Sequence, residues 1–121
     1  MQTRIKNTRF QMTDEVREYL GKKIASLETF FDKNDPTVAW DIEEQLDARV
    51  DTSNMFRAEF NLRMNGEVYR AEATGATMLA ALDEVKDALK VTLRERHSKS
   101  RHFIRDSGRR FKDFLRGWRS K

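Results

Sequence analysis

The sequence predicts an α+β fold, in which a four-stranded sheet carries two helices on one face. Four stretches alternate apolar with polar residues, as strands do when one side is buried and the other meets water. Two longer stretches instead repeat apolar residues at helical spacing. The order along the chain is strand, helix, three strands, helix. Elements of these kinds bury their apolar faces against each other as a two-layer sandwich.

The first strand and the first helix are marked by simple local signals. Residues 2–6 alternate and predict a short strand. Thr13 precedes two acidic residues, which is typical of a helix N-cap followed by its first turn. Apolar residues then recur at helical spacing, so a helix is expected from about Thr13 to Phe31. Pro36 disfavours helical backbone in the residue before it and closes this segment.

Three further strands follow, the last two joined as a hairpin. Residues 38–43 alternate, whereas residues 44–55 are polar and acidic and predict a loop. Residues 56–64 give the clearest alternation, and Asn65-Gly66 after them is the pair that a type I′ hairpin turn prefers. This turn fixes the register, because a slip of one residue would expose every aromatic side chain. The predicted pairs are Met64 with Glu67, Leu62 with Tyr69, Phe60 with Ala71, and Ala58 with Ala73.

The second helix is predicted to start after Gly75, with Thr77 as its cap, and to run to about His97. Its apolar stripe consists of Met78, Ala81, Leu82, Val85, Leu89 and Leu93. Trp40, Phe56 and Tyr69 occupy inward positions of their strands and are expected in the core.

Composition excludes several classes of protein. The chain of 121 residues has no cysteine, so it has neither disulfides nor cysteine-ligated metal. It has no apolar run long enough to span a membrane and no apolar stretch at its start. We therefore expect a cytoplasmic protein without a membrane partner.

Charge is distributed unevenly along the chain. The net charge is +4, but residues 98–121 hold nine Lys or Arg and only two acidic residues. This division predicts a folded domain over residues 1–98 and a basic tail over residues 99–121. A basic tail on a near-neutral body indicates a polyanionic partner, either nucleic acid or an anionic membrane surface; the alternative is a disordered tail that only improves solubility.

Several short stretches over residues 1–98 occur together in a characteristic order and spacing. They are Met1-Gln2-x-x-Ile5, Thr13-Asp14-x-Val16-Arg17-x-Tyr19, Leu27-Glu28-x-Phe30-Phe31-Asp32, Ala58-Glu59-Phe60-x-Leu62, Asn65-Gly66-Glu67-Val68-Tyr69-x-Ala71-x-Ala73 and Gly75-x-Thr77-Met78-x-Ala80-Ala81-Leu82-Asp83. In these features the chain resembles the ribosome hibernation-promoting factor family, also called ribosome-associated inhibitor or sigma-factor modulation proteins.

The resemblance implies both a fold and a function. It implies a β-α-β-β-β-α domain related in shape to double-stranded-RNA-binding domains. It implies binding to the small ribosomal subunit and its ribosomal RNA, in the channel used by mRNA and tRNA. Occupying this channel would inhibit translation and promote ribosome hibernation under stress or slow growth. The chain resembles a tailed form without the second, dimerisation domain of long family members.

Basic residues on the helices are the candidate RNA contacts. Lys86, Lys90 and Arg94 succeed each other at four-residue spacing, and we expect them to form one solvent-facing line that suits phosphates. The alternative is an ordinary solvated surface with acidic neighbours, and the resemblance favours RNA. The full predicted set is Lys22, Lys23, Lys86, Lys90, Arg94, Arg101, Arg105, Arg109 and Arg110.

No catalytic, cofactor or metal site is expected. His97 and His102 are too few ligands for zinc, and no phosphate loop or nucleophile motif is present. The acidic residues fall in a loop and on solvent-facing strand positions, where ordinary pKa values are expected. Opposite charges on the solvent face of the sheet suggest a structural role there.

The tail carries an apolar stripe at helical spacing within basic surroundings. Its members are Phe111, Phe114, Leu115 and Trp118. An amphipathic helix is predicted over residues 107–119, with Ser107-Gly108 as its cap and hinge. It could contact the ribosome, a membrane surface, or the protein itself; we favour the ribosome, with self-association second. The alternative function is a non-catalytic regulatory interaction protein that acts through this tail without binding RNA.

Overall fold

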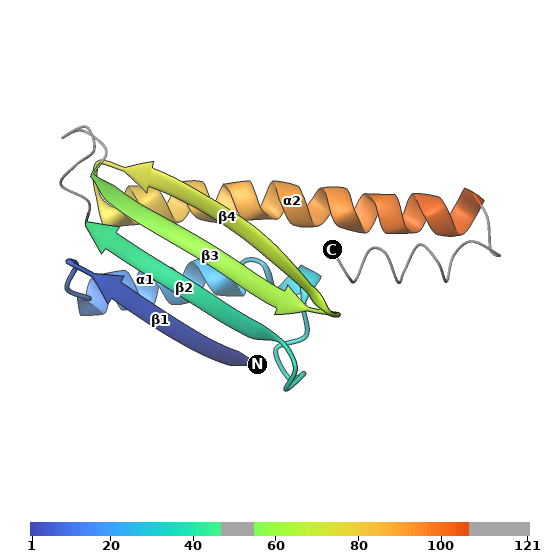
Figure 1. Ribbon diagram of the computed structural model, residues 1–121, viewed down its shortest axis with the longest axis horizontal. Coiled ribbons are helices and arrows are strands. Elements are labelled where there is room, and N and C mark those ends of the chain that lie inside the picture. The colour runs from blue at the N-terminus through green and yellow to red at the C-terminus, as the bar shows by residue number, and fades with distance from the viewer. Residues whose placement is uncertain (47–54, 107–121) are drawn as a thin grey trace.

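The fold is a single mixed sheet backed by two helices. A computed structural model describes residues 1–46 and 55–106, with side chains described up to Arg96. Its elements are β1 (Gln2–Thr8), α1 (Asp14–Ala25), the short 3-10 turn η1 (Glu28–Phe30), β2 (Ala39–Leu46), β3 (Phe56–Met64), β4 (Glu67–Gly75) and α2 (Met78–Asp106). The strand order is β1-β2-β3-β4, with β1 parallel to β2 and the other pairs antiparallel. Figure 1 shows both helices behind the sheet, which confirms the predicted α+β fold.

The β3–β4 hairpin has the register that the sequence predicts. Asn65 and Gly66 adopt positive φ angles of 56° and 76°, as a type I′ turn requires. Met64 therefore lies opposite Glu67, and Leu62 lies opposite Tyr69. This register places every aromatic side chain of the hairpin on the helix side of the sheet.

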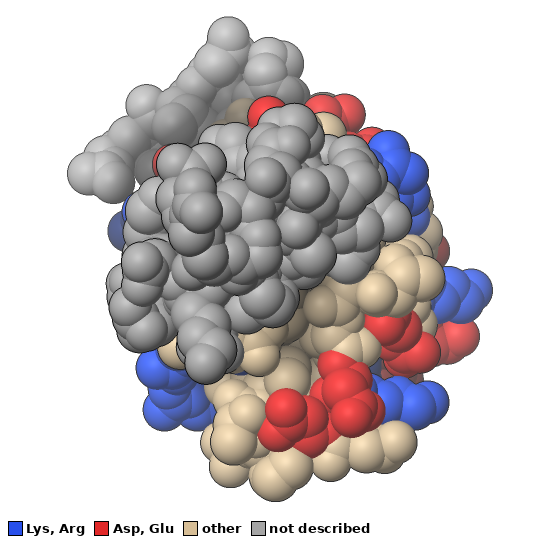
Figure 2. All heavy atoms as spheres, turned by 90° about the vertical axis from the view of Figure 1, so that its right-hand side faces the viewer, with Lys and Arg blue, Asp and Glu red and all other residues tan. Residues whose placement is uncertain are grey.

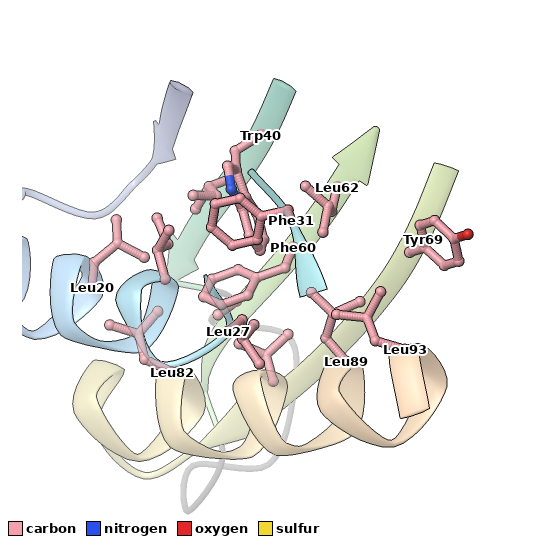
Figure 3. Close-up of a cluster of buried hydrophobic side chains, with 14 of the residues drawn as sticks. Leu20, Leu27, Phe31, Trp40, Phe60, Leu62, Tyr69, Leu82, Leu89 and Leu93 are labelled. Carbon is pink, nitrogen blue, oxygen red and sulfur yellow. The ribbon is translucent and has the colours of Figure 1, made fainter. Parts of the chain in front are cut away.

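The core lies between this face of the sheet and the helices. Trp40 is fully buried and packs edge-on against Phe31 and Phe60, with ring centroids 5.6 and 5.7 Å apart (Figure 3). All six predicted stripe residues of α2 are buried, from Met78 to Leu93. The helix caps are also as predicted, since the hydroxyls of Thr13 and Thr77 accept backbone N–H groups of the first turns of α1 and α2.

The first helix is shorter than expected. It ends at Ala25 rather than continuing to Phe31. Ser26 closes it, because its backbone N–H bonds to the last turn and its hydroxyl donates to the carbonyl of Lys23 at 2.6 Å. The chain then tightens into η1, which still brings Leu27 and Phe31 into the core. Apolar spacing alone does not distinguish this tighter turn from one more turn of α-helix.

The second helix is longer than expected, because it continues past His97 to Asp106. No Gly or Pro occurs between Met78 and Asp106, so nothing in the backbone ends it earlier. Among the side chains described up to Arg96, Leu93 is the last buried apolar residue of α2. The last part of α2 therefore extends beyond the sheet, as Figure 1 shows. The predicted tail helix over residues 107–119 lies outside the described residues, and the division at residue 98 stays a prediction.

The second strand also extends further than predicted. It includes residues 44–46, which were expected in a loop, and Leu46 pairs with Phe56 of β3. Pairing with β1 on one side and β3 on the other satisfies the backbone of this polar segment. The extension places Glu44 on the core face of the sheet, where it is fully buried.

Candidate nucleic-acid interface

The predicted basic residues of the described region lie on the helical layer, but they are not equivalent. Lys22 is exposed in the last turn of α1, and Arg94 is exposed on α2. Lys90 lies at the margin of the core and is partly covered. None of these three makes an ion pair within the residues that the structure describes. They are the cations best placed to meet an external phosphate.

Lys23 is held in a contact between the two helices. Its Nζ lies 2.6 Å from a carboxylate oxygen of Asp83 on α2, and 4.6 Å from the ring centre of Tyr19. The Tyr19 hydroxyl donates to the same Asp83 oxygen at 2.8 Å. The Asp83 carboxylate raises the pKa of Lys23, and the lysine in turn lowers the pKa of Asp83. Asp83 therefore ties α1 to α2 and leaves Lys23 only 19% exposed.

Lys86 is also less available than expected. Its side chain is 18% exposed and its Nζ lies 2.7 Å from the carboxylate of Asp87. The expectation that all three basic residues of α2 point to solvent is therefore wrong for Lys86. The cause is the helical repeat, because each step of four residues turns about 40° around the axis. A line at this spacing starts beside the core at Lys86 and reaches the exposed surface only at Arg94.

The opposite, sheet face also carries many cations, and its arginines are paired there, whereas Lys6 of β1 has no ion pair among the described residues. Asp41 of β2 binds Arg4 at 2.9 Å and Arg63 at 2.6 Å. Further ion pairs join Arg57 and Arg70 to the carboxylates of Glu59 and Glu72 across β3 and β4. This pairing fits the prediction that the sheet face has a structural role.

Glu44 is the buried acidic group that sequence reasoning missed. It lies between Asn7 of β1 and Ala58 of β3, and neither carboxylate oxygen has a hydrogen-bond partner in the described part of the chain. Burial raises the pKa of Glu44 to about 7, against a smaller opposite effect of the Arg17 cation. The expectation of ordinary pKa values for all acidic residues is therefore wrong. The signal in the sequence was weak, because Glu44 itself interrupts the apolar positions of β2, which resume only at Leu46.

A second buried acidic residue, Glu67, has a defined partner. Both of its carboxylate oxygens accept from Nη1 of Arg96, at 2.8 and 3.1 Å. The Arg96 guanidinium lies 5.6 Å from the ring centre of Tyr69. Burial, together with the nearby Glu67 carboxylate, raises the pKa of Tyr69 to about 12. The hairpin register already placed Glu67 inward, but its partner 29 positions along the chain had no signal in the sequence.

The remaining predicted contacts belong to the C-terminal part. Arg101 and Arg105 lie within α2, where only the backbone is described. The other predicted basic and aromatic tail residues, Arg109, Arg110, Phe111, Phe114, Leu115 and Trp118, lie outside the described residues. Figure 2 looks onto the end of the molecule toward which α2 points, and shows basic and acidic side chains next to one another on the described surface.

Two further chemical features concern only the described residues. No cluster of three or more His, Asp or Glu side chains there could hold a metal ion. No helix of the described part is long and apolar enough to cross a membrane.

Comparison with known proteins identifies the family. The model of the family described as "Sigma 54 modulation protein / S30EA ribosomal protein" matches residues 3–101. The chain belongs to this family. Its members are ribosome-associated regulatory proteins of ribosome hibernation, so the resemblance seen in the sequence is confirmed.

Solved structures agree with this membership. The N-terminal domain of Thermus thermophilus Protein Y is 25% identical, with a TM-score of 0.63, and the match covers 78% of this chain and 98% of that one. A ribosomal subunit interface protein from Coxiella burnetii is 14% identical with a TM-score of 0.63, over 81% of this chain and 99% of that one. The second likeness concerns the fold alone.

Proposed function

We propose that this protein binds the small ribosomal subunit through its helical layer and inhibits translation by occupying the path of mRNA and tRNA. Lys22, Lys90 and Arg94 make the first contacts with ribosomal RNA phosphates. The basic residues of the extended α2 and of the tail add further contacts. The action is steric, because a rigid domain in this channel excludes the substrates of translation without any chemical step.

The observation that carries this proposal is the difference between the two faces of the molecule. On the sheet face, Asp41, Glu59 and Glu72 already neutralise the arginines around them. On the helical face, Lys90 and Arg94 have no such partners among the described residues. A cation that is already paired must give up its partner to bind a phosphate, whereas an unpaired one gains a partner and releases counterions. RNA is therefore expected on the helical face.

Co-sedimentation with purified ribosomal subunits tests the proposal. Charge reversal of Lys90→Glu with Arg94→Glu should weaken binding to the small subunit and reduce the slope of log affinity against log salt by about two. The matched control is Lys6→Glu with Lys33→Glu, which changes the net charge equally on exposed sites of β1 and the α1–β2 connection. The control should bind with little change.

The results can also contradict the proposal. If both variants lost the same affinity for the small subunit, only the total charge would matter and the helical face would not be the interface. Binding that does not depend on salt would favour the alternative, a regulatory protein that acts through its tail without RNA. Inhibition of translation is measured separately, by testing whether small subunits that carry the protein still bind mRNA or tRNA.

A further inference from the structure

The ion pair between the buried Glu67 and the partly exposed Arg96 occupies a special place in the fold. Leu93 is the last residue of the apolar stripe of α2, with 2% exposure. One turn later the inward position holds Arg96 instead of an apolar residue. Its partner Glu67 opens β4 on the core face, and the Glu67 side chain is completely buried. The pair therefore joins α2 to the first residue of β4, one turn beyond Leu93.

A charged pair at this point has a property that an apolar contact lacks. Apolar contacts have little directionality, whereas a planar guanidinium has donors in a fixed geometry. Here one guanidinium nitrogen meets both oxygens of Glu67, and the group lies against the ring of Tyr69. Ion pairs that are wholly or partly buried add little net stability compared with apolar residues of similar size, and here Arg96 remains 27% exposed. The pair is therefore better explained by the orientation that it imposes on α2 than by the stability that it adds.

The orientation of α2 at Arg96 sets the position of its far end. Residues 97–106 continue α2 for about 15 Å at the usual rise per residue. A change of about 20° in the helix direction at Arg96 would move the far end by about 5 Å. This distance exceeds the length of a hydrogen bond, so cations on this segment would lose their phosphates.

We propose that Glu67 and Arg96 are positioning residues, which aim the α2 segment of residues 97–106 at ribosomal RNA. This inference rests on the proposed function. The segment carries Lys99, Arg101 and Arg105 in its sequence. Neither Glu67 nor Arg96 needs to touch RNA, because they act by holding the direction of the helix.

The direction of the helix can be measured without any RNA. The chain has no cysteine, so Val68→Cys and Ser100→Cys give two unique sites for nitroxide labels. Val68 is exposed on β4, and Ser100 lies in the extended part of α2. Pulsed electron double resonance should give one narrow distance distribution, which broadens with Glu67→Gln. Arg96→Lys, which keeps the charge but loses the planar group that lies against the Tyr69 ring, should broaden it as well. Glu95→Gln on the exposed side of α2 is the matched control and should leave it unchanged.

The link to binding is tested in the full chain by a double-mutant cycle. Glu67→Gln should lower the affinity for small ribosomal subunits about fivefold in the wild-type background. It should have almost no effect once Arg101→Ser and Arg105→Ser have removed the charges that it positions. Thermal unfolding of each variant verifies that the domain is folded.

The outcomes separate this inference from the proposed function. If the unmodified chain does not bind small subunits, the proposed function fails. If it binds, but the distance distribution does not respond to Glu67→Gln and Arg96→Lys, the inference is overturned. The inference is also overturned if Glu67→Gln lowers the affinity equally in the wild type and in the variant with Arg101→Ser and Arg105→Ser. The pair would then act independently of residues 97–106.

Discussion

Replacing Glu44 by Gln should remove a pH dependence from the stability of the fold. The glutamine keeps the size and shape of the side chain but cannot ionise. In the folded protein the pKa of Glu44 is about 7, compared with 4.5 for an unperturbed glutamate. The folded state therefore holds this proton at pH values where the unfolded chain has lost it.

The sign and size of the effect come from this difference. Below about pH 4.5 both states are protonated, and the contribution of Glu44 to the stability is fully present. As the pH rises toward 7 the unfolded chain ionises first, so the free energy of unfolding falls. A pKa difference of about 2.5, at about 1.4 kcal/mol per unit, gives a loss of about 3 kcal/mol. Above about pH 7 both states are ionised and the loss is complete.

Urea unfolding, followed by circular dichroism between about pH 5 and 8, measures the effect. The wild type should lose stability relative to Glu44→Gln by about 2–3 kcal/mol over this range. Glu43→Gln is the matched control, since Glu43 is the neighbouring residue on the opposite face of β2 and is only partly buried. A wild-type and Glu44→Gln difference that stays constant with pH would refute the reasoning, because the carboxylate would then be hydrated or paired.

Three further changes test other parts of the structure. Asp83→Ala removes the acceptor that Lys23 and Tyr19 share and should lower the free energy of unfolding, measured with urea, by about 1 kcal/mol. An unchanged urea midpoint would mean that these contacts do not stabilise the protein in solution. Gly75→Ala places a Cβ 2.7 Å from the backbone of α2 and should lower the free energy of unfolding by about 1–3 kcal/mol. Gly21→Ala meets open space inside α1 and should raise the free energy of unfolding by about 1 kcal/mol. Equal effects of the two changes would contradict this geometry. In the tail, changing both Phe114 and Trp118 to Ser keeps all positive charges and removes half of the apolar stripe. This double change should lower the affinity for small subunits. Unchanged affinity and oligomeric state would show that the tail acts by charge alone.

The parts of the fold that could be predicted are those fixed by local signals. Asn65-Gly66 determines both a turn and a register, and each apolar residue of the hairpin then has one possible side. Thr13 and Thr77 precede their helices at the position where a side-chain oxygen satisfies an otherwise unpaired N–H group. In each case the physical cause lies within a few residues, so the sequence contains it.

The parts that could not be predicted depend on contacts between distant segments. Glu44 looks like the start of a polar loop, and only pairing with both β1 and β3 shows that it lies in the core. Lys23 looks like an exposed cation until Asp83, far along the chain, is placed beside it. The exposure of Lys86 depends on how α2 is turned about its axis relative to the sheet.

The two outer strands of the sheet have a consequence for behaviour at high concentration. An open strand edge is a template on which further chains can add, and this is a common route to aggregation. In Figure 1, α2 crosses behind β4, the outer strand on that side of the sheet. At the other edge, β1 bears Arg4 and Lys6 on its solvent face, both exposed. Arg4 is paired with Asp41, so a second copy that aligned its β1 there would bring the unpaired Lys6 charges together, and we expect this edge to resist the addition of further copies even when the protein accumulates.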